Sequence, residues 1–143
     1  MVRSPGRATI LATGMLLLFC GVAGSAELRV NVLGADKPGK VIGYVYGDRQ
    51  TFAKFTAPVA TLTCDPHDGG CLASIPNLMP GKYAIVAFED LNGNGDLDTN
   101  FLGIPVEPYG FSNDAMNPIR SPTFDEAGVE LADETKTITI HLH

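Results

Sequence analysis

The chain has 143 residues, which is the length of a single domain, and its 16 acidic residues exceed its 10 basic ones, for a net charge of −6. No run of lysine or arginine offsets this charge. Such a chain repels the phosphates of nucleic acids and of anionic lipids, so we expect no nucleic acid among its partners.

The first 26 residues have the organisation of a secretory signal peptide. Arg3 and Arg7 precede a segment, residues 8–26, that carries no charge, has an apolar centre and ends in Gly-Ser-Ala. This order predicts export and a mature chain of residues 27–143 that is periplasmic or secreted. Loss of the two arginines leaves 8 basic against 16 acidic residues, a net charge of −8, and we expect no stable membrane insertion after cleavage.

Two other interpretations of this segment stay open. The uncharged stretch is nearly long enough to anchor the chain in a membrane, although threonines and glycines dilute it. Acylation at Cys20 would make the protein a lipoprotein, although the bulky Phe19 stands where a small residue is required.

Short segments of alternating or β-branched apolar residues, separated by turn residues, predict strands along the rest of the chain. In chain order they are residues 28–32, 41–46, 59–63, 72–75, 82–89, 128–131 and 135–142. A single helical turn at 50–55 is expected to direct Phe52 and Phe55 inward. Residues 90–125 have no long periodic segment and contain four prolines. About seven short strands without a long helix predict an all-β fold, a single antiparallel β-sandwich of residues 27–143.

Cys64 and Cys71 are the pair of cysteines that remains after export, and in an oxidising compartment such a pair forms a disulfide. The Asp-Pro and Asp-Gly-Gly sequences between them are turn residues. We therefore predict a hairpin whose strands are joined by a Cys64–Cys71 disulfide, worth about 2–3 kcal/mol. The alternative is a metal site of both thiols and His67, which lacks a fourth ligand in this segment.

Oxygen-bearing side chains stand at every second position of residues 90–98, directly after the strongest predicted strand. They are Asp90, Asn92, Asn94, Asp96 and Asp98, with Gly93 and Gly95 between them. Calcium takes roughly six to eight oxygen ligands, and this spacing matches the first half of the EF-hand loop, with Gly95 at its sharp turn. We therefore expect a cation site with Ca²⁺ as its cofactor, ahead of magnesium. By this resemblance Asp96 contributes its backbone carbonyl and the other four residues contribute side-chain oxygens or a water contact.

The pattern departs from the EF-hand at its last ligand, where Phe101 replaces a bidentate glutamate. The missing ligand has to come from elsewhere, and the candidates are Glu89, Asn100 and Glu107. The alternative is a polar turn without a metal, because Asn-Gly and Asp are ordinary residues of tight turns.

The loop 103–124, rich in glycine and proline, is the candidate surface for a partner protein or a small ligand. Its candidate contacts are Tyr109, Phe111, Asn113 and Phe124, although aromatic side chains in such loops also fasten the loop to a core. No Gly-x-Ser-x-Gly nucleophile motif is present, so we expect a module without catalytic activity. A calcium-dependent hydrolase or lyase that uses Glu107 or Asp98 is the alternative.

The run DLNGNGDLDTNFLGIPVEPYGFSN at residues 90–113, followed by Pro122-Thr123-Phe124, resembles the bacterial domain-of-unknown-function family 2141. The resemblance covers the mature chain. It implies an exported protein with a transthyretin-like (prealbumin-like) or immunoglobulin-like β-sandwich. It implies no particular activity and contributes no catalytic residues.

Overall fold

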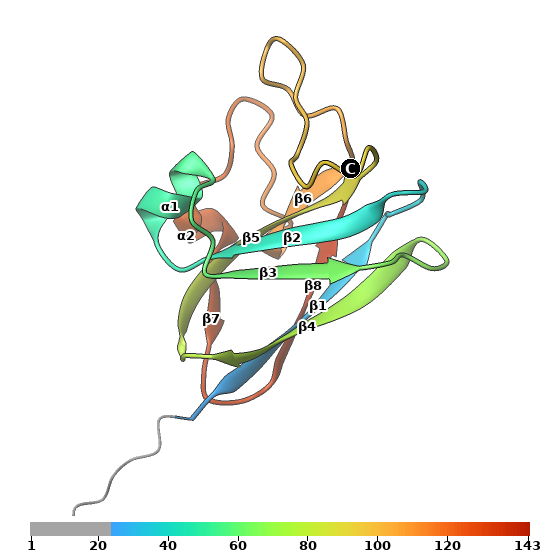
Figure 1. The fold of residues 1–143 in the computed structure, drawn as a ribbon. Coiled ribbons are helices and arrows are strands. Elements are labelled where there is room, and N and C mark those ends of the chain that lie inside the picture. Colours follow the sequence, from blue (N-terminus) through green and yellow to red (C-terminus); the bar gives the residue numbers. More distant parts are fainter. Residues whose placement is uncertain (1–23) are drawn as a thin grey trace, which may run out of the picture.

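Two β-sheets packed face to face form the body of the protein in a computed structural model that describes residues 24–143 (Figure 1). The strands of this part are β1 (Ala26–Leu33), β2 (Lys40–Tyr46), β3 (Ala60–Cys64), β4 (Gly70–Leu78), β5 (Gly81–Asp90), β6 (Tyr109–Phe111), β7 (Val129–Leu131) and β8 (Lys136–His141). The helices are α1 (Arg49–Lys54), the 3-10 turn η1 (Ser112–Asp114) and α2 (Phe124–Ala127). The predicted all-β sandwich is confirmed, with eight strands where about seven were expected.

The predicted signal peptide, residues 1–26, lies almost entirely outside the described residues. Its last residue, Ala26, is the buried first residue of β1 and pairs with Leu78 of β4. Cleavage after Ala26 would therefore remove one residue pair from this end of the sheet. Among residues 24–143, no helix is long and apolar enough to cross a membrane.

The strand order is β4-β1-β8 in one sheet and β3-β2-β5-β6 in the other, with β7 also paired to β5. Strand β1 is antiparallel to β4 but parallel to β8, so the sandwich is not antiparallel throughout. The parallel pair arises because the chain leaves β7, which belongs with β5, and crosses to the other sheet before it enters β8. The strand that the sequence did not predict is β6, which has only three residues.

Strand β5 is the centre of the larger sheet and is buried from its third residue to its end. Because successive side chains of a strand point to opposite faces, it contributes to two clusters. Ile85 and Ala87 belong to the core between the sheets, whereas Ala84 and Val86 face a second cluster on the outer side. Burial on both faces explains why this segment is apolar at nearly every position.

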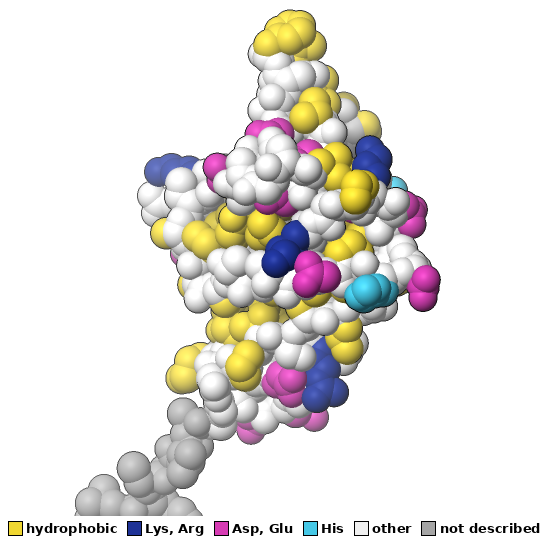
Figure 2. Space-filling view, turned by 45° about the vertical axis from the view of Figure 1, so that its right-hand side comes forward, with side chains coloured by type: hydrophobic (Ala, Val, Ile, Leu, Met, Phe, Trp, Pro, Cys, Tyr) yellow, Lys and Arg dark blue, Asp and Glu magenta, His cyan; other side chains and the backbone are white. Residues whose placement is uncertain are grey.

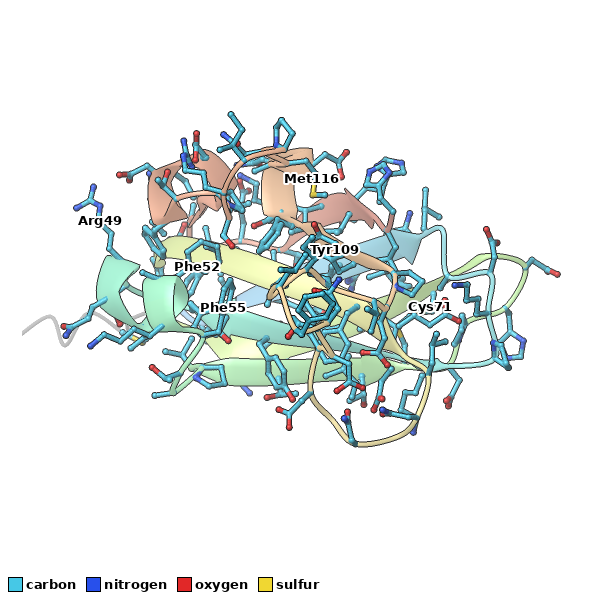
Figure 3. The ribbon with its side chains drawn as sticks, turned by 90° about the horizontal axis from the view of Figure 1, so that it is seen from above. Arg49, Phe52, Phe55, Cys71, Tyr109 and Met116 are labelled. Atoms are coloured by element: carbon cyan, nitrogen blue, oxygen red, sulfur yellow. A yellow bond between two sulfur atoms is a disulfide. The ribbon has the colours of Figure 1, made fainter. Side chains whose placement is uncertain are left out.

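The second cluster is aromatic and lies beneath α1 and α2. Phe52 of α1 makes edge-to-face contacts with Phe111 and with Phe124, each with ring centroids 6.1 Å apart. Figure 3 shows Phe52 and Phe55 on the side of α1 that faces the sheet. Phe52 is buried as predicted, but Phe55 is 44% exposed, because it ends α1 in the left-handed conformation and sits at the rim of the cluster.

Two seams join the edges of the sheets. Cys64 at the end of β3 is bonded to Cys71 of β4, with Cα atoms 6.0 Å apart. The predicted disulfide is present, but the predicted hairpin is wrong, because β3 pairs with β2 and β4 pairs with β1. The disulfide therefore links the two sheets, and since both sulfurs are bonded, the alternative metal site with His67 is not formed. At the other seam, Tyr109 and His143 exchange backbone hydrogen bonds of 3.3 and 3.0 Å, which fasten β6 to the chain after β8.

Reduction of the disulfide is expected to lower the free energy of unfolding by about 2–3 kcal/mol, because the closed loop is short. Urea unfolding with and without reductant measures this difference. The double variant Cys64→Ser/Cys71→Ser should unfold at the same urea concentration as the reduced protein, and reductant should not change its midpoint. Unfolding midpoints that are equal in the oxidised and reduced protein would contradict the prediction.

Candidate functional site

The loop between β5 and β6 leaves the end of the sandwich and projects away from it (Figure 1). We call residues 91–107 the arm. Its base is closed by the buried carboxylate of Glu107, which accepts hydrogen bonds from the backbone N–H of Leu91 (2.8 Å) and of Asp98 (3.1 Å). The N–H of Val106 donates to the carbonyl of Asp98 (2.9 Å) beside them. One side chain therefore ties the start of the arm to its middle and its end.

The acidic loop, residues 90–98, is organised around Asp90. The carboxylate of Asp90 is almost fully buried and accepts hydrogen bonds from Gly93 N–H (2.8 Å) and Gly95 N–H (2.9 Å). Both glycines have a positive φ, 74° and 82°, which a residue with a Cβ adopts only with strain. The glycines thus allow the loop to fold back over the Asp90 carboxylate at the end of β5.

The predicted ligands Asn92, Asn94 and Asp98 come together on the outer side of this loop. The Asp98 carboxylate accepts hydrogen bonds from the side-chain amide of Asn94 (3.0 and 3.2 Å) and from that of Asn92. The side-chain oxygen of Asn92 accepts from Asn94 N–H, and that of Asn94 accepts from Asp96 N–H (3.1 and 2.9 Å). A cation at this point needs oxygens rather than NH₂ groups turned toward it, so binding requires both amides to rotate away from these partners.

The remaining candidate ligands are separated by the structure. Asp96 is exposed, and the additional candidate Asn100 uses its side-chain oxygen within the arm, for the N–H groups of Leu102 and Ile104. Glu89 points to the other face of β5, and of the three additional candidates Glu107 is the one in contact with the acidic loop. Among the described residues, no three His, Cys, Asp or Glu side chains gather as a metal-ligand group. The cluster is therefore one of amides around a carboxylate.

Tyr44 of β2 lies against the acidic loop and was not identified from the sequence. Its hydroxyl donates a hydrogen bond to the carbonyl of Gly95. Burial raises the pKa of Tyr44, and the negative charges of Asp96 and Asp90 raise it further. Nothing in the sequence near Tyr44 reveals this contact, because 51 residues separate it from Gly95.

An open pocket of about 410 Å³ lies beside the end of β5, between the returning part of the arm, the turn before β2 and the chain after β8. Its polar lining comes from Asp36, Lys37, Glu89, Glu107, Tyr109 and His143. Glu89 is fully buried, and its carboxylate accepts hydrogen bonds from Lys37 N–H (3.3 Å) and Gly39 N–H (3.2 Å), which hold the turn between β1 and β2.

Among the predicted ligand contacts, Phe111 and Phe124 are buried in the aromatic cluster. The side-chain amide of Asn113 donates to the carbonyls of Glu126 and Gly128, so it fastens the end of α2. Tyr109 lines the pocket beside Glu107 and is near the middle of the view in Figure 3. The structure therefore places Tyr109 where a ligand could reach it and gives the other three residues a role in packing the loop.

Beyond Asp98 the arm continues as a small hairpin, residues 99–106, that we call the apolar tip; Thr99 pairs with Pro105, and Val106 returns the chain to the base of the arm. Its large side chains are exposed to 94% at Phe101, 68% at Leu102, 55% at Ile104 and 57% at Val106. Hydrophobic side chains form the end of the projection in Figure 2. The sequence does not mark these residues as a surface, because apolar side chains are expected in the core when nothing shows where the loop goes.

A family model described as "Uncharacterized protein conserved in bacteria (DUF2141)" matches residues 30–139. The chain belongs to this family. The DUF2141 match runs from β1 to β8, so it includes the arm, the acidic loop and both cysteines. The resemblance seen in the sequence is thereby confirmed at the level of the family. No curated protein and no solved structure matches the chain.

Glu107→Ala is expected to loosen the base of the arm in this DUF2141 protein, because two backbone N–H groups lose a charged acceptor. Such hydrogen bonds contribute about 1.5–3 kcal/mol each, so amide exchange at Leu91 and Asp98 should accelerate at least tenfold. Hydrogen exchange followed by NMR measures this. Glu130→Ala, at an exposed position of β7, serves as the control. Equal exchange rates at Asp98 in the variant and the wild type would show that Glu107 does not close the arm.

Proposed function

We propose that this protein is an exported binding module without catalytic activity, in which the acidic loop binds calcium and the arm presents a surface to a partner or small ligand. Export is supported by the signal-peptide pattern of residues 1–26 and agrees with the disulfide, since disulfides form and persist in oxidising compartments.

The convergence of Asn92, Asn94 and Asp98 gives the calcium proposal its main support. The three side chains belong to the alternating set of residues 90–98, and both amides are already within hydrogen-bonding distance of the Asp98 carboxylate. Rotation of the two amides would turn their oxygens toward the position that Asp98 already faces. Glycines with positive φ beside them supply the tight turn that a calcium loop requires.

Calcium would supply positive charge where the loop has an excess of negative charge. Asp90, Asp96 and Asp98 lie within nine residues, and the ion pairs of the described residues involve none of the three. An ion held by Asp98 would also stiffen the arm, because the backbone of Asp98 is bonded to both Glu107 and Val106. The proposed role of calcium is therefore to fix the direction in which the arm points.

The alternative function is a calcium-dependent hydrolase or lyase that uses Glu107 or Asp98. Both oxygens of Glu107 accept backbone hydrogen bonds, and Asp98 is occupied by two amides. These contacts favour a structural role for both carboxylates over general acid–base chemistry. A screen for calcium-dependent hydrolysis or elimination separates the two functions: turnover that Asp98→Asn abolishes would favour the enzyme.

Calcium at about a hundredfold excess over its Kd is expected to stabilise the folded protein by about 2.7 kcal/mol. For a domain of this size the melting temperature should rise by about 5–10 °C. Differential scanning calorimetry in calcium and in chelator measures the shift. Asn94→Ala and Asp98→Ala should abolish the response, whereas Asp133→Ala, an exposed carboxylate before β8, should keep it.

A wild-type midpoint that calcium moves no further than sodium does at matched ionic strength would refute calcium binding. The acidic loop would then be a polar turn that its own hydrogen bonds hold in place.

A further inference from the structure

The acidic loop contains both Asn-Gly pairs of the chain, Asn92-Gly93 and Asn94-Gly95, and both asparagines are exposed. Asparagine before glycine is the sequence most prone to spontaneous deamidation, in which the backbone nitrogen of the next residue attacks the side-chain Cγ. Glycine hinders this attack least, because it has no Cβ. A Cβ added at either glycine would meet no atom within 4 Å, so the fold leaves space beside both pairs.

The side-chain carbonyls that would be attacked are polarised by the loop itself. The side-chain oxygen of Asn92 accepts a hydrogen bond from Asn94 N–H (3.1 Å), and that of Asn94 accepts one from Asp96 N–H (2.9 Å). Attack at Cγ places negative charge on this oxygen, and a donor that already points at it stabilises that charge. Both asparagines are therefore prepared as electrophiles.

The attacking nitrogens, in contrast, are held by one buried carboxylate. Asp90 accepts hydrogen bonds from Gly93 N–H (2.8 Å) and Gly95 N–H (2.9 Å). Each nitrogen has to lose this proton in order to attack, and a negative charge on it is disfavoured beside a carboxylate. The hydroxyl of Tyr44 adds a second restraint, because it binds the carbonyl of Gly95. Reaction therefore requires the loop to open and the nitrogen to leave Asp90.

From these contacts we propose that Asn92 and Asn94 are sites of spontaneous deamidation, which Asp90 restrains in the folded protein. Once the restraint is lost, the glycine nitrogen gives its proton to water and bonds to Cγ, and the Cγ–Nδ2 bond breaks with release of ammonia. The resulting succinimide ring takes up one water at either of its carbonyls and opens to aspartate or isoaspartate. The net reaction is hydrolysis of the amide, with water as the co-reactant.

Deamidation would reverse the attraction at the centre of the loop. In the amide form, the side chains of Asn92 and Asn94 donate hydrogen bonds to the Asp98 carboxylate. An ionised carboxylate in place of either amide has no proton to donate and repels Asp98. The backbone of Asp98 is bonded to Glu107 and Val106, so the repulsion acts on the base of the arm. None of these steps involves calcium, so this inference and the proposed function can fail separately.

Peptide mapping by mass spectrometry measures the conversion at each asparagine after incubation in chelator, with the protein either folded or denatured in guanidinium chloride. Asn92 and Asn94 should convert at least tenfold more slowly in the folded wild type than in the denatured one. Asn100 is an internal control. Its side-chain oxygen accepts the N–H of Leu102 in the same way, but a phenylalanine follows it, so it should convert more slowly than both in the denatured protein.

Variants identify the restraint. Asp90→Ala, with the circular dichroism spectrum of the wild type, should raise the rates at Asn92 and Asn94 in the folded protein at least tenfold. The control Asp133→Ala, which removes an exposed carboxylate outside the arm, should leave both rates unchanged. Tyr44→Phe keeps the ring and removes the hydroxyl, so it should accelerate Asn94 more than Asn92.

Equal rates in the folded and the denatured wild type would overturn the inference, because the fold would then exert no restraint. A folded Asp90→Ala protein that deamidates no faster than the wild type would also overturn it. If Asp90→Ala does not fold, Tyr44→Phe decides: an unchanged rate at Asn94 would count against the restraint, and a selective increase there would support it.

Discussion

Three buried carboxylates, held by backbone N–H groups, organise the end of the sandwich from which the arm rises. Glu89 and Asp90 are consecutive residues at the end of β5, so they point to opposite faces of the sheet. Glu89 holds the turn before β2, Asp90 holds the acidic loop, and Glu107 closes the arm. None of the three forms an ion pair with a basic side chain among residues 24–143. The geometry of the site depends on these carboxylates, because a buried charge is tolerated only where such hydrogen bonds replace water.

The sequence was sufficient to predict the fold class, since strands with period-two or continuously apolar patterns identify themselves locally. It did not reveal β6, because three residues carry no period. The position of β6 depends on Gly110, where a Cβ would lie 2.2 Å from the carbonyl oxygen of His141. It also did not show that β3 and β4 belong to different sheets, because a turn sequence between two cysteines looks the same in a hairpin and at a corner between sheets.

At the candidate site, residue spacing predicted contacts between side chains that are close in the sequence. It did not predict contacts between residues that are far apart in the sequence, because these depend on where the loop goes in space. Asn92, Asn94 and Asp98 were found because the tight loop brings three of its five alternating oxygen-bearing positions together, whereas Asp90 bonds to the loop backbone and Asp96 stays exposed. Glu107 was named as a possible ligand, but its hydrogen bonds at the base of the arm depend on how the arm returns to the sheet. The exposure of Phe101 had no signal at all, since a loop phenylalanine is more often buried.

The two seams have a consequence for how other chains can approach this protein. An exposed sheet edge offers a row of free N–H and carbonyl groups, to which an extended segment can add as a further strand. Here the disulfide joins the edge strands β3 and β4. On the other side, the backbone N–H and carbonyl of Tyr109 in β6 are bonded to those of His143. Strand addition is thereby hindered where the disulfide joins β3 to β4 and where His143 pairs with Tyr109 of β6. At these two places the chain is protected from edge-to-edge aggregation.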